Sequence, residues 1–224
     1  MIFSAHDLAR GCGGVLVAEA GPGRICTDSR TIGPENWFLA LKGERFDAHD
    51  FLDTAQAAGA QGVIAERVPP NWSTGFVQVS DGLIALQDLA RHTRAGFTGP
   101  VVGITGSCGK TTTKNMLASL LSAHRRVVAS PASYNNDIGV PLTPLSAGAS
   151  CETLVVEMGT NAPGEIEALC RTAQPSAAIV TNVGSSHLAG LGSEAGVAQE
   201  KGALPASIGP DGWVVLNADC GWSD

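Results

Sequence analysis

The chain has 224 residues, enough for one large domain or two modest ones, and its 44% hydrophobic content and mean hydropathy of +0.12 allow a buried core. The formal net charge of −7 argues against nucleic acid or an acidic membrane surface as the main partner. The six cysteines show no C-x-x-C spacing and no accompanying histidine cluster, so we expect neither a zinc site nor a disulfide framework.

The N-terminal segment lacks the basic and apolar regions of a signal peptide, and no apolar run is long enough to span a bilayer. We therefore expect a cytoplasmic protein without membrane insertion.

Strands and helices alternate through the first hundred residues, and we expect Ser4 and Asp81 to cap two of the helices. The predicted helices span residues 3–12, 51–60 and 82–95, and the predicted strands span 24–29, 37–41, 62–66 and 76–79.

Polar, turn-rich loops follow two of these strands and carry the cations Arg30, Lys42 and Arg45. They are candidates for binding an anion, because an arginine can grip a phosphate through two hydrogen bonds and a lysine acts as a point charge. The alternative is that all three are solvated surface charges.

A linker at 96–100 precedes a strand, a glycine-rich loop and a helix in direct succession. The apolar strand at 101–104 leads into Thr105-Gly-Ser-Cys-Gly-Lys-Thr111, and a helical pattern follows from 112 to 123. This is the context that a phosphate-binding loop requires. Gly106 and Gly109 allow backbone N–H groups to turn toward phosphate oxygens, and the positive end of the helix adds to the attraction.

In such a loop Lys110 would reach the β- and γ-phosphates, and the Thr111 hydroxyl would bind Mg²⁺. The sequence departs from the common pattern, because Ile104 stands where a glycine is usual and Gly103 lies one residue earlier. The alternative is a glycine-rich turn with a chance lysine.

The remaining residues continue the alternation of strands and helices, which predicts an α/β fold with a mostly parallel, doubly wound sheet. We place a domain boundary between a small α/β domain at 1–98 and this doubly wound domain at 99–224, because a new strand pattern begins after the linker. The predicted strands lie at 126–129, 153–157, 177–181 and 213–216, the helices at 163–170 and 193–206, and a polar loop at 130–139.

Polar residues follow two of these strands. Glu157 ends one, Thr181 and Asn182 end another, and His187 lies in the loop beyond. Ligands of open α/β sheets bind at the carboxyl ends of strands, so these groups should converge beside the glycine-rich loop. Glu157 is then a candidate Mg²⁺ ligand, with a solvated carboxylate as the alternative. His187 is either a ligand or an ordinary loop residue.

Two of the four lysines are expected at the surface. Lys114 is predicted on the solvated face of the helix at 112–123. Lys201 lies on the helix at 193–206, where its residue context predicts a surface lysine paired with a nearby acid.

These motifs resemble those of the Mur ligases, the ATP-dependent amide ligases of peptidoglycan assembly. Asp28-Ser-Arg30 and the run 37–50 are similar to the family's N-terminal substrate-binding domain. The runs 135–142 and 157–166 resemble the subgroup that joins D-Ala-D-Ala to UDP-N-acetylmuramoyl-tripeptide. The resemblance to the central domain is carried by residues 105–112, Glu157-Met-Gly159, Thr181-Asn-Val-Gly184 with His187, and Lys201.

The resemblance implies that ATP phosphorylates the terminal carboxylate of the UDP-linked tripeptide and that the amine of D-Ala-D-Ala attacks the acyl phosphate. It implies ATP and two Mg²⁺ ions as cofactors, and a CO₂-derived carbamate on Lys201 in place of the surface lysine. The implied ATP-binding residues are Thr105, Gly106, Ser107, Cys108, Gly109, Lys110, Thr111 and Thr112. Catalysis is implied for Lys110, Glu157, His187 and Lys201, metal binding for Thr111, Glu157, His187 and Lys201, and substrate binding for Ser29, Arg30, Lys42, Arg45, Asn135, Asn136, Thr181 and Asn182.

Family enzymes have a UDP-binding, an ATPase and a C-terminal domain, so the resemblance places this chain in about the first half and implies that it does not form the amide bond alone. The alternatives are another Mur ligase that adds a single amino acid, a folylpolyglutamate synthase, or a non-catalytic UDP- and nucleotide-binding fragment. The UDP-type first domain argues against the folate enzyme. The set of Lys110, Glu157, His187 and Lys201 argues against a non-catalytic fragment.

Overall fold

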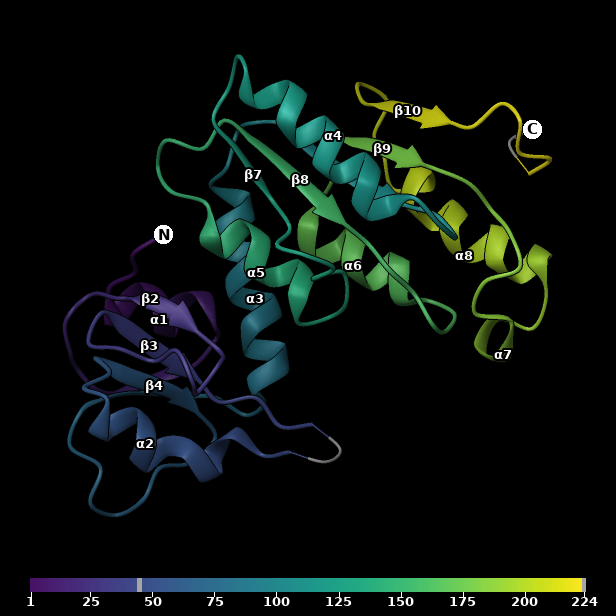
Figure 1. Ribbon diagram of the computed structural model, residues 1–224. Helices are drawn as coiled ribbons and strands as arrows, with labels where there is room; N and C mark the ends of the chain where they lie inside the picture. Colours follow the sequence, from purple (N-terminus) through teal and green to yellow (C-terminus); the bar gives the residue numbers. More distant parts are fainter. Residues whose placement is uncertain (44–45, 223–224) are drawn as a thin grey trace. The chain divides into compact units, whose positions relative to one another are not determined.

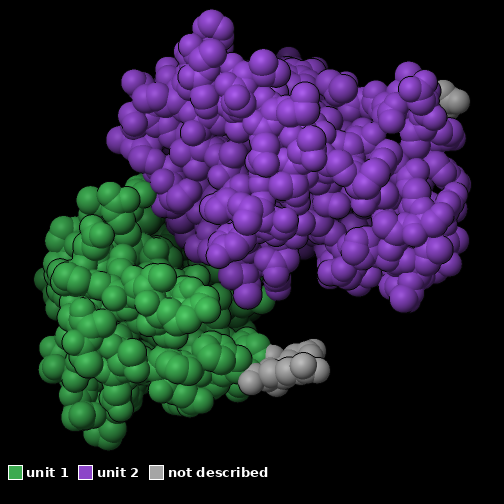
Figure 2. All heavy atoms as spheres, in the orientation of Figure 1, with its two compact units in different colours: residues 1–92 green, residues 93–224 purple. Residues whose placement is uncertain are grey.

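The computed structural model describes residues 1–43 and 46–222, so Arg45 lies outside the described residues. The contacts within the chain divide it into two compact units, residues 1–92 and 93–224, which Figure 2 shows in green and purple. The division falls inside helix α3 (Gly82–Ala95), earlier than the boundary expected after residue 98. Each unit contains one five-stranded sheet.

The first unit has the strand order β1-β5-β4-β3-β2, in which all neighbours are parallel except the antiparallel pair β1 and β5. Strand β1 was not expected, because a four-residue run after paired glycines becomes a strand only by pairing with the distant β5. The elements are α1 (Ala5–Gly11), β1 (Val15–Ala18), β2 (Arg24–Cys26), β3 (Asn36–Leu39), η1 (Ala48–Phe51), α2 (Leu52–Ala57), β4 (Gly62–Ala65), β5 (Gly75–Gln78) and α3.

Both predicted helix caps of this unit are confirmed. The Ser4 hydroxyl accepts a hydrogen bond from the Asp7 N–H at 3.1 Å, and the Asp81 carboxylate accepts one from the Ile84 N–H at 2.9 Å. One core cluster packs Phe38 of β3 against Leu52 of α2. Capping side chains thus mark the starts of α1 and α3, and apolar burial packs α2 against the sheet.

The second unit has the strand order β10-β9-β6-β8-β7, and every neighbouring pair is parallel. Helix α4 covers one face of the sheet, and α5, α6 and α8 cover the other (Figure 1). This arrangement confirms the predicted doubly wound α/β sheet. The elements are β6 (Val101–Thr105), α4 (Lys110–Ser122), β7 (Val127–Ala129), α5 (Gly139–Ser146), β8 (Thr153–Glu157), α6 (Glu165–Ala173), β9 (Ala177–Val180), α7 (Leu188–Leu191), α8 (Glu194–Ala206) and β10 (Trp213–Leu216).

Several helix boundaries differ from those predicted, each for a local reason. Helix α4 begins at Lys110, ahead of residue 112, because Gly109 takes a left-handed conformation (φ 80°) and serves as the N-cap. Helix α6 begins at Glu165, after the residue 163 expected, because Gly164 has φ 85°. Helix α5 was missed because prolines within it read as breaks.

Among the described helices, none is long and apolar enough to cross a membrane.

Candidate functional site

The glycine-rich loop joins β6 to α4 at the carboxyl edge of the second sheet. Gly106 has φ 151° and Gly109 has φ 80°, and a Cβ on Gly106 would overlap the Thr181 hydroxyl. Only glycine fits this path without strain. The ammonium of Lys110 donates to the Gly106 carbonyl at 2.7 Å, which holds the charge over the loop. The first N–H groups of α4 have no acceptor within the helix, so the loop offers the donors that a phosphate requires.

The loop is held in place by the segment that follows β9. The Thr181 hydroxyl donates to the Cys108 carbonyl at 2.6 Å, and the Asn182 side chain accepts from the Cys108 N–H at 3.0 Å. The Ser107 N–H donates to the Asn182 carbonyl at 3.1 Å, and the Gly184 N–H donates to the Ser107 hydroxyl at 2.9 Å. Thr181 and Asn182, which were expected to contact substrate, hold the glycine-rich loop in its conformation.

Glu157 lies at the end of β8 with only 1% of its surface exposed, so the alternative of a solvated carboxylate is wrong. Its Oε1 accepts a hydrogen bond from the Asn135 amide at 3.0 Å, and its backbone N–H donates to the Ser130 hydroxyl at 3.1 Å. Its Oε2 is buried and accepts no hydrogen bond. Although the Lys114 ammonium lies 3.4 Å away, this oxygen keeps lone pairs without a hydrogen bond, which suits Mg²⁺, an ion that prefers carboxylates together with phosphate oxygens.

Lys114 was predicted on the solvated face of α4, and this prediction is wrong. Its side chain is 1% exposed, and its ammonium lies 3.4 Å from Glu157 Oε2 and donates to the Ala132 carbonyl. The spacing held the signal that was missed. Lys114 follows Lys110 by four residues, so the two share the helix face that meets the loop and the sheet edge, where Glu157 and the Ala132 carbonyl bury Lys114.

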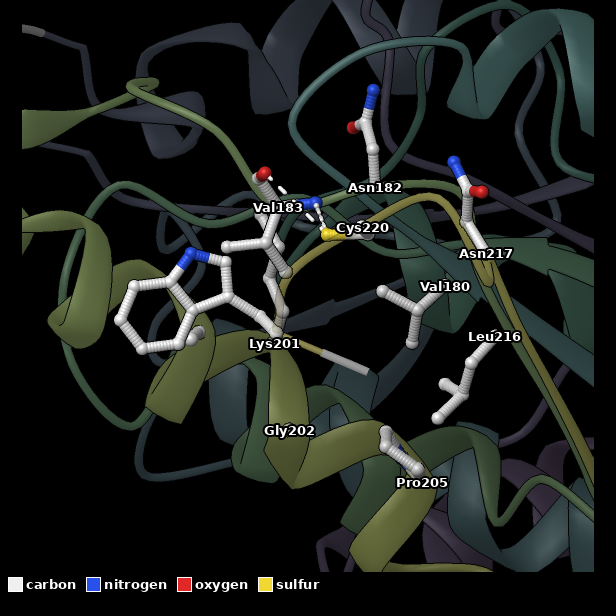
Figure 3. Close-up of a pocket in the computed structure, with 11 residues that line it drawn as sticks. Val180, Asn182, Val183, Lys201, Gly202, Pro205, Leu216, Asn217 and Cys220 are labelled. Carbon is white, nitrogen blue, oxygen red and sulfur yellow. Dashed lines mark hydrogen bonds between the residues drawn. The ribbon is translucent and has the colours of Figure 1, made fainter. Parts of the chain in front are cut away.

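Lys201 is also buried, with 1% exposure, so the residue-based expectation of a surface lysine is wrong. It lines a cavity of about 80 Å³ together with Asn182, Asn217 and Cys220 (Figure 3). Burial, with a smaller contribution from the charge of Lys110, lowers the pKa of Lys201 to about 8. The adjacent acid, Glu200, instead accepts hydrogen bonds from backbone N–H groups at the start of α6.

Another predicted ligand, His187, is the exposed N-cap residue of α7 and has the left-handed φ of 56°. None of the contacts among the described residues joins its ring to Glu157 or Lys201. Likewise, within residues 1–43 and 46–222, no group of three or more His, Cys, Asp or Glu side chains could hold a metal ion by itself. A metal at Glu157 would therefore depend on further oxygens, such as the Thr111 hydroxyl and those of a phosphate.

The two asparagines of the polar loop after β7 have different environments. Asn135 is the donor to Glu157 described above, whereas the Asn136 side chain accepts from the Gly139 N–H at 2.9 Å and so stabilises the start of α5. Asn135 therefore orients the candidate metal ligand.

In the first unit, the Arg30 guanidinium donates two hydrogen bonds to the Asp28 carboxylate, at 2.8 and 2.7 Å. These bonds hold the pKa of Asp28 at about 2. Arg30 and Lys42 are exposed, and Ser29 is half-buried in the same loop as Arg30. The pairing with Asp28 orders the Arg30 side chain at the surface of its own unit.

A profile of the Mur ligase middle domain matches residues 104–224 of this chain. The UDP-N-acetylmuramoyl-tripeptide–D-alanyl-D-alanine ligases of Synechocystis sp. and Bacillus subtilis are each 41% identical to it over 197 residues, covering 87% of the chain and 43% of the relative. The chain thus spans less than half the length of these curated relatives.

The solved structures that resemble this chain include Mur ligases as well. MurF from Acinetobacter baumannii has a TM-score of 0.93 and 34% identity, covering 100% of this chain and 50% of that one. MurF ligase from Thermotoga maritima, in complex with ADP, has a TM-score of 0.79 and 38% identity, covering 88% of this chain and 46% of that one. Because the middle-domain profile matches more than half of the residues, from the phosphate-binding loop onward, the chain belongs to the Mur ligase family.

Proposed function

We propose that the chain carries the nucleotide site and the UDP-substrate site of a cytoplasmic, ATP-dependent ligase that joins D-Ala-D-Ala to UDP-N-acetylmuramoyl-tripeptide. The observation that carries the proposal is the pairing of the phosphate-binding loop with Glu157, whose buried Oε2 accepts no hydrogen bond. Support comes from relatives that bear this enzyme's name at 41% identity. The first unit, with Ser29, Arg30 and Lys42, would bind the UDP-sugar, and Arg45 would join them.

The reaction has a charge problem, because a carboxylate must attack the terminal phosphoryl group of a polyanion. Lys110 would move from the Gly106 carbonyl to the β- and γ-phosphates and screen their charge. The N–H groups at the start of α4 would hold the phosphate oxygens in place, and Thr181 and Asn182 would keep the loop in its binding conformation. Thr111 and Glu157 would hold Mg²⁺, which when bound neutralises developing charge on the phosphate.

Lys201 would act as a metal ligand together with His187 after reaction of its amine with CO₂, which converts a cation into a carbamate. That reaction needs the neutral amine, and burial favours the neutral form of Lys201. Asn182 and Asn217 line the same cavity, but their amides are hydrogen-bonded to Cys108 and to Thr181, so the carbamate would depend on the metal for its charge.

We expect Lys201→Ala to lower the ligase activity of the complete enzyme by about 10²-fold, because a metal ligand is lost. Short carboxylates such as acetate should restore part of it by filling the vacated position. The carbamate itself can be detected by ¹³C NMR after incubation with ¹³C-bicarbonate. Full activity of Lys201→Ala in bicarbonate-depleted buffer would contradict this role.

We expect Arg30→Ala to weaken binding of the UDP-linked tripeptide roughly tenfold or more, because a hydrogen bond to a charged group is lost. Isothermal titration calorimetry measures the affinity. Arg10→Ala is a matched control, because Arg10 also forms an exposed ion pair with a nearby aspartate, Asp7. An affinity unchanged by Arg30→Ala would remove Arg30 from the site.

The proposed function is tested by separate titrations of the chain with Mg-ATP and with UDP-N-acetylmuramoyl-tripeptide. Binding of both supports the ligase. Binding of the UDP compound alone would favour a non-catalytic substrate-binding module, and binding of neither would overturn the proposal.

A further inference from the structure

The buried ion pair between Lys114 and Glu157 combines two opposite charges that the fold has removed from water. Both side chains are 1% exposed, and Lys114 Nζ lies 3.4 Å from Glu157 Oε2. The ammonium is also held by the Ala132 carbonyl, so it is anchored to the loop after β7. Burying a charge without a partner is costly, which explains why these two lie together.

This position has a consequence for a metal ion that approaches Glu157. An ion that binds Oε2 would lie within a few ångströms of the ammonium, and charges this close repel strongly where water is excluded. The carboxylate that would attract the ion is already neutralised by Lys114. Among the described residues, no group of three or more His, Cys, Asp or Glu side chains could hold the ion in its place.

A nucleotide changes this balance, because a triphosphate brings several negative charges and oxygen ligands to the adjacent loop. Lys110 lies one helical turn before Lys114 and would screen part of that charge. The remaining phosphate charge would offset the repulsion between Lys114 and the metal.

We propose that Lys114 makes metal binding at Glu157 conditional on the nucleotide, so that the metal enters as part of a metal–triphosphate complex and not alone. Lys114 is a positioning residue in this scheme, since it acts through Glu157. The inference rests on the proposed function, which assigns Glu157 to the metal.

The test uses the full chain and Mn²⁺ as the probe, with free Mn²⁺ counted by electron paramagnetic resonance in the presence and absence of ATP. Wild-type protein should bind Mn²⁺ weakly alone and tightly with ATP. Lys114→Met removes the charge and keeps the length of the side chain, so it should tighten Mn²⁺ binding without ATP by on the order of tenfold to a hundredfold.

Three controls isolate the charge at this position. Lys114→Arg keeps the charge and should behave as wild type. The double variant Lys114→Met with Glu157→Gln should lose the gain in Mn²⁺ affinity. Arg125→Met removes an exposed charge just beyond α4 and should leave the Mn²⁺ affinity unchanged. A folded Lys114→Met variant with wild-type Mn²⁺ affinity would overturn the proposal.

Wild-type protein alone provides a second test, which does not depend on the folding of Lys114→Met. If it binds Mn²⁺ without ATP as tightly as with ATP, and Glu157→Gln abolishes that binding, the proposal is wrong. Failure of the proposed function looks different, because then neither ATP nor the UDP-linked tripeptide binds the wild-type chain. If the wild-type chain binds ATP tightly in the presence of Mn²⁺ and Lys114→Met has the Mn²⁺ affinity of wild type, only the inference about Lys114 is wrong.

Discussion

Lys110→Ala is expected to reduce ATP-dependent phosphate release by the complete enzyme roughly 10³-fold, the scale seen when a cation or donor that stabilises phosphoryl transfer is removed. The physical reason is that Lys110 is the ammonium placed over the phosphate-binding loop, bonded to the Gly106 carbonyl. Phosphate release and Mg-ATP affinity are measured on the same purified variant.

The fold should survive this change, because Lys110 is only half-buried and its described hydrogen bond is to the loop and not to the core. The melting temperature should therefore stay near that of wild type. Lys110→Arg is the matched variant, since it keeps the charge but not the compact ammonium. Its rate of phosphate release should lie between those of wild type and Lys110→Ala. Normal phosphate release by Lys110→Ala would refute the role of Lys110.

Lys114→Met is expected to destabilise the second unit by about 3–5 kcal/mol, because it leaves Glu157 as a buried charge without its partner. Chemical denaturation followed by circular dichroism measures the free energy of unfolding. The double variant Lys114→Met with Glu157→Gln should recover most of the loss, since it removes both charges. A double-mutant cycle then gives the coupling between the two side chains.

An unchanged free energy of unfolding in Lys114→Met would mean that the pair contributes nothing to stability. Arg126→Met is the surface comparison. Its guanidinium pairs with Glu152 at 3.6 Å, and both side chains are exposed, so its loss should cost less than about 1 kcal/mol.

The strands of the second sheet could be predicted from the sequence, because each is specified by residues close together in the chain. A continuous apolar run predicted the buried strand β8, whose observed bounds match the prediction. The glycine-rich loop was readable because its backbone path requires glycine at 106 and 109. Family resemblance extended this reading to the UDP-linked substrate, which local signals alone do not specify.

The sequence by itself determined that a strand, a glycine-rich loop and a helix would follow one another, and that Glu157 would end a strand beside that loop. Only the tertiary structure decided which polar groups are buried there. Lys114 and Lys201 read as surface lysines, yet each is 1% exposed, because strands and helices distant in the sequence close over them. Thr181 and Asn182 were found to hold Cys108, more than seventy residues earlier. Burial and such pairings depend on how distant segments pack, and packing is the property that a local pattern of residues does not encode.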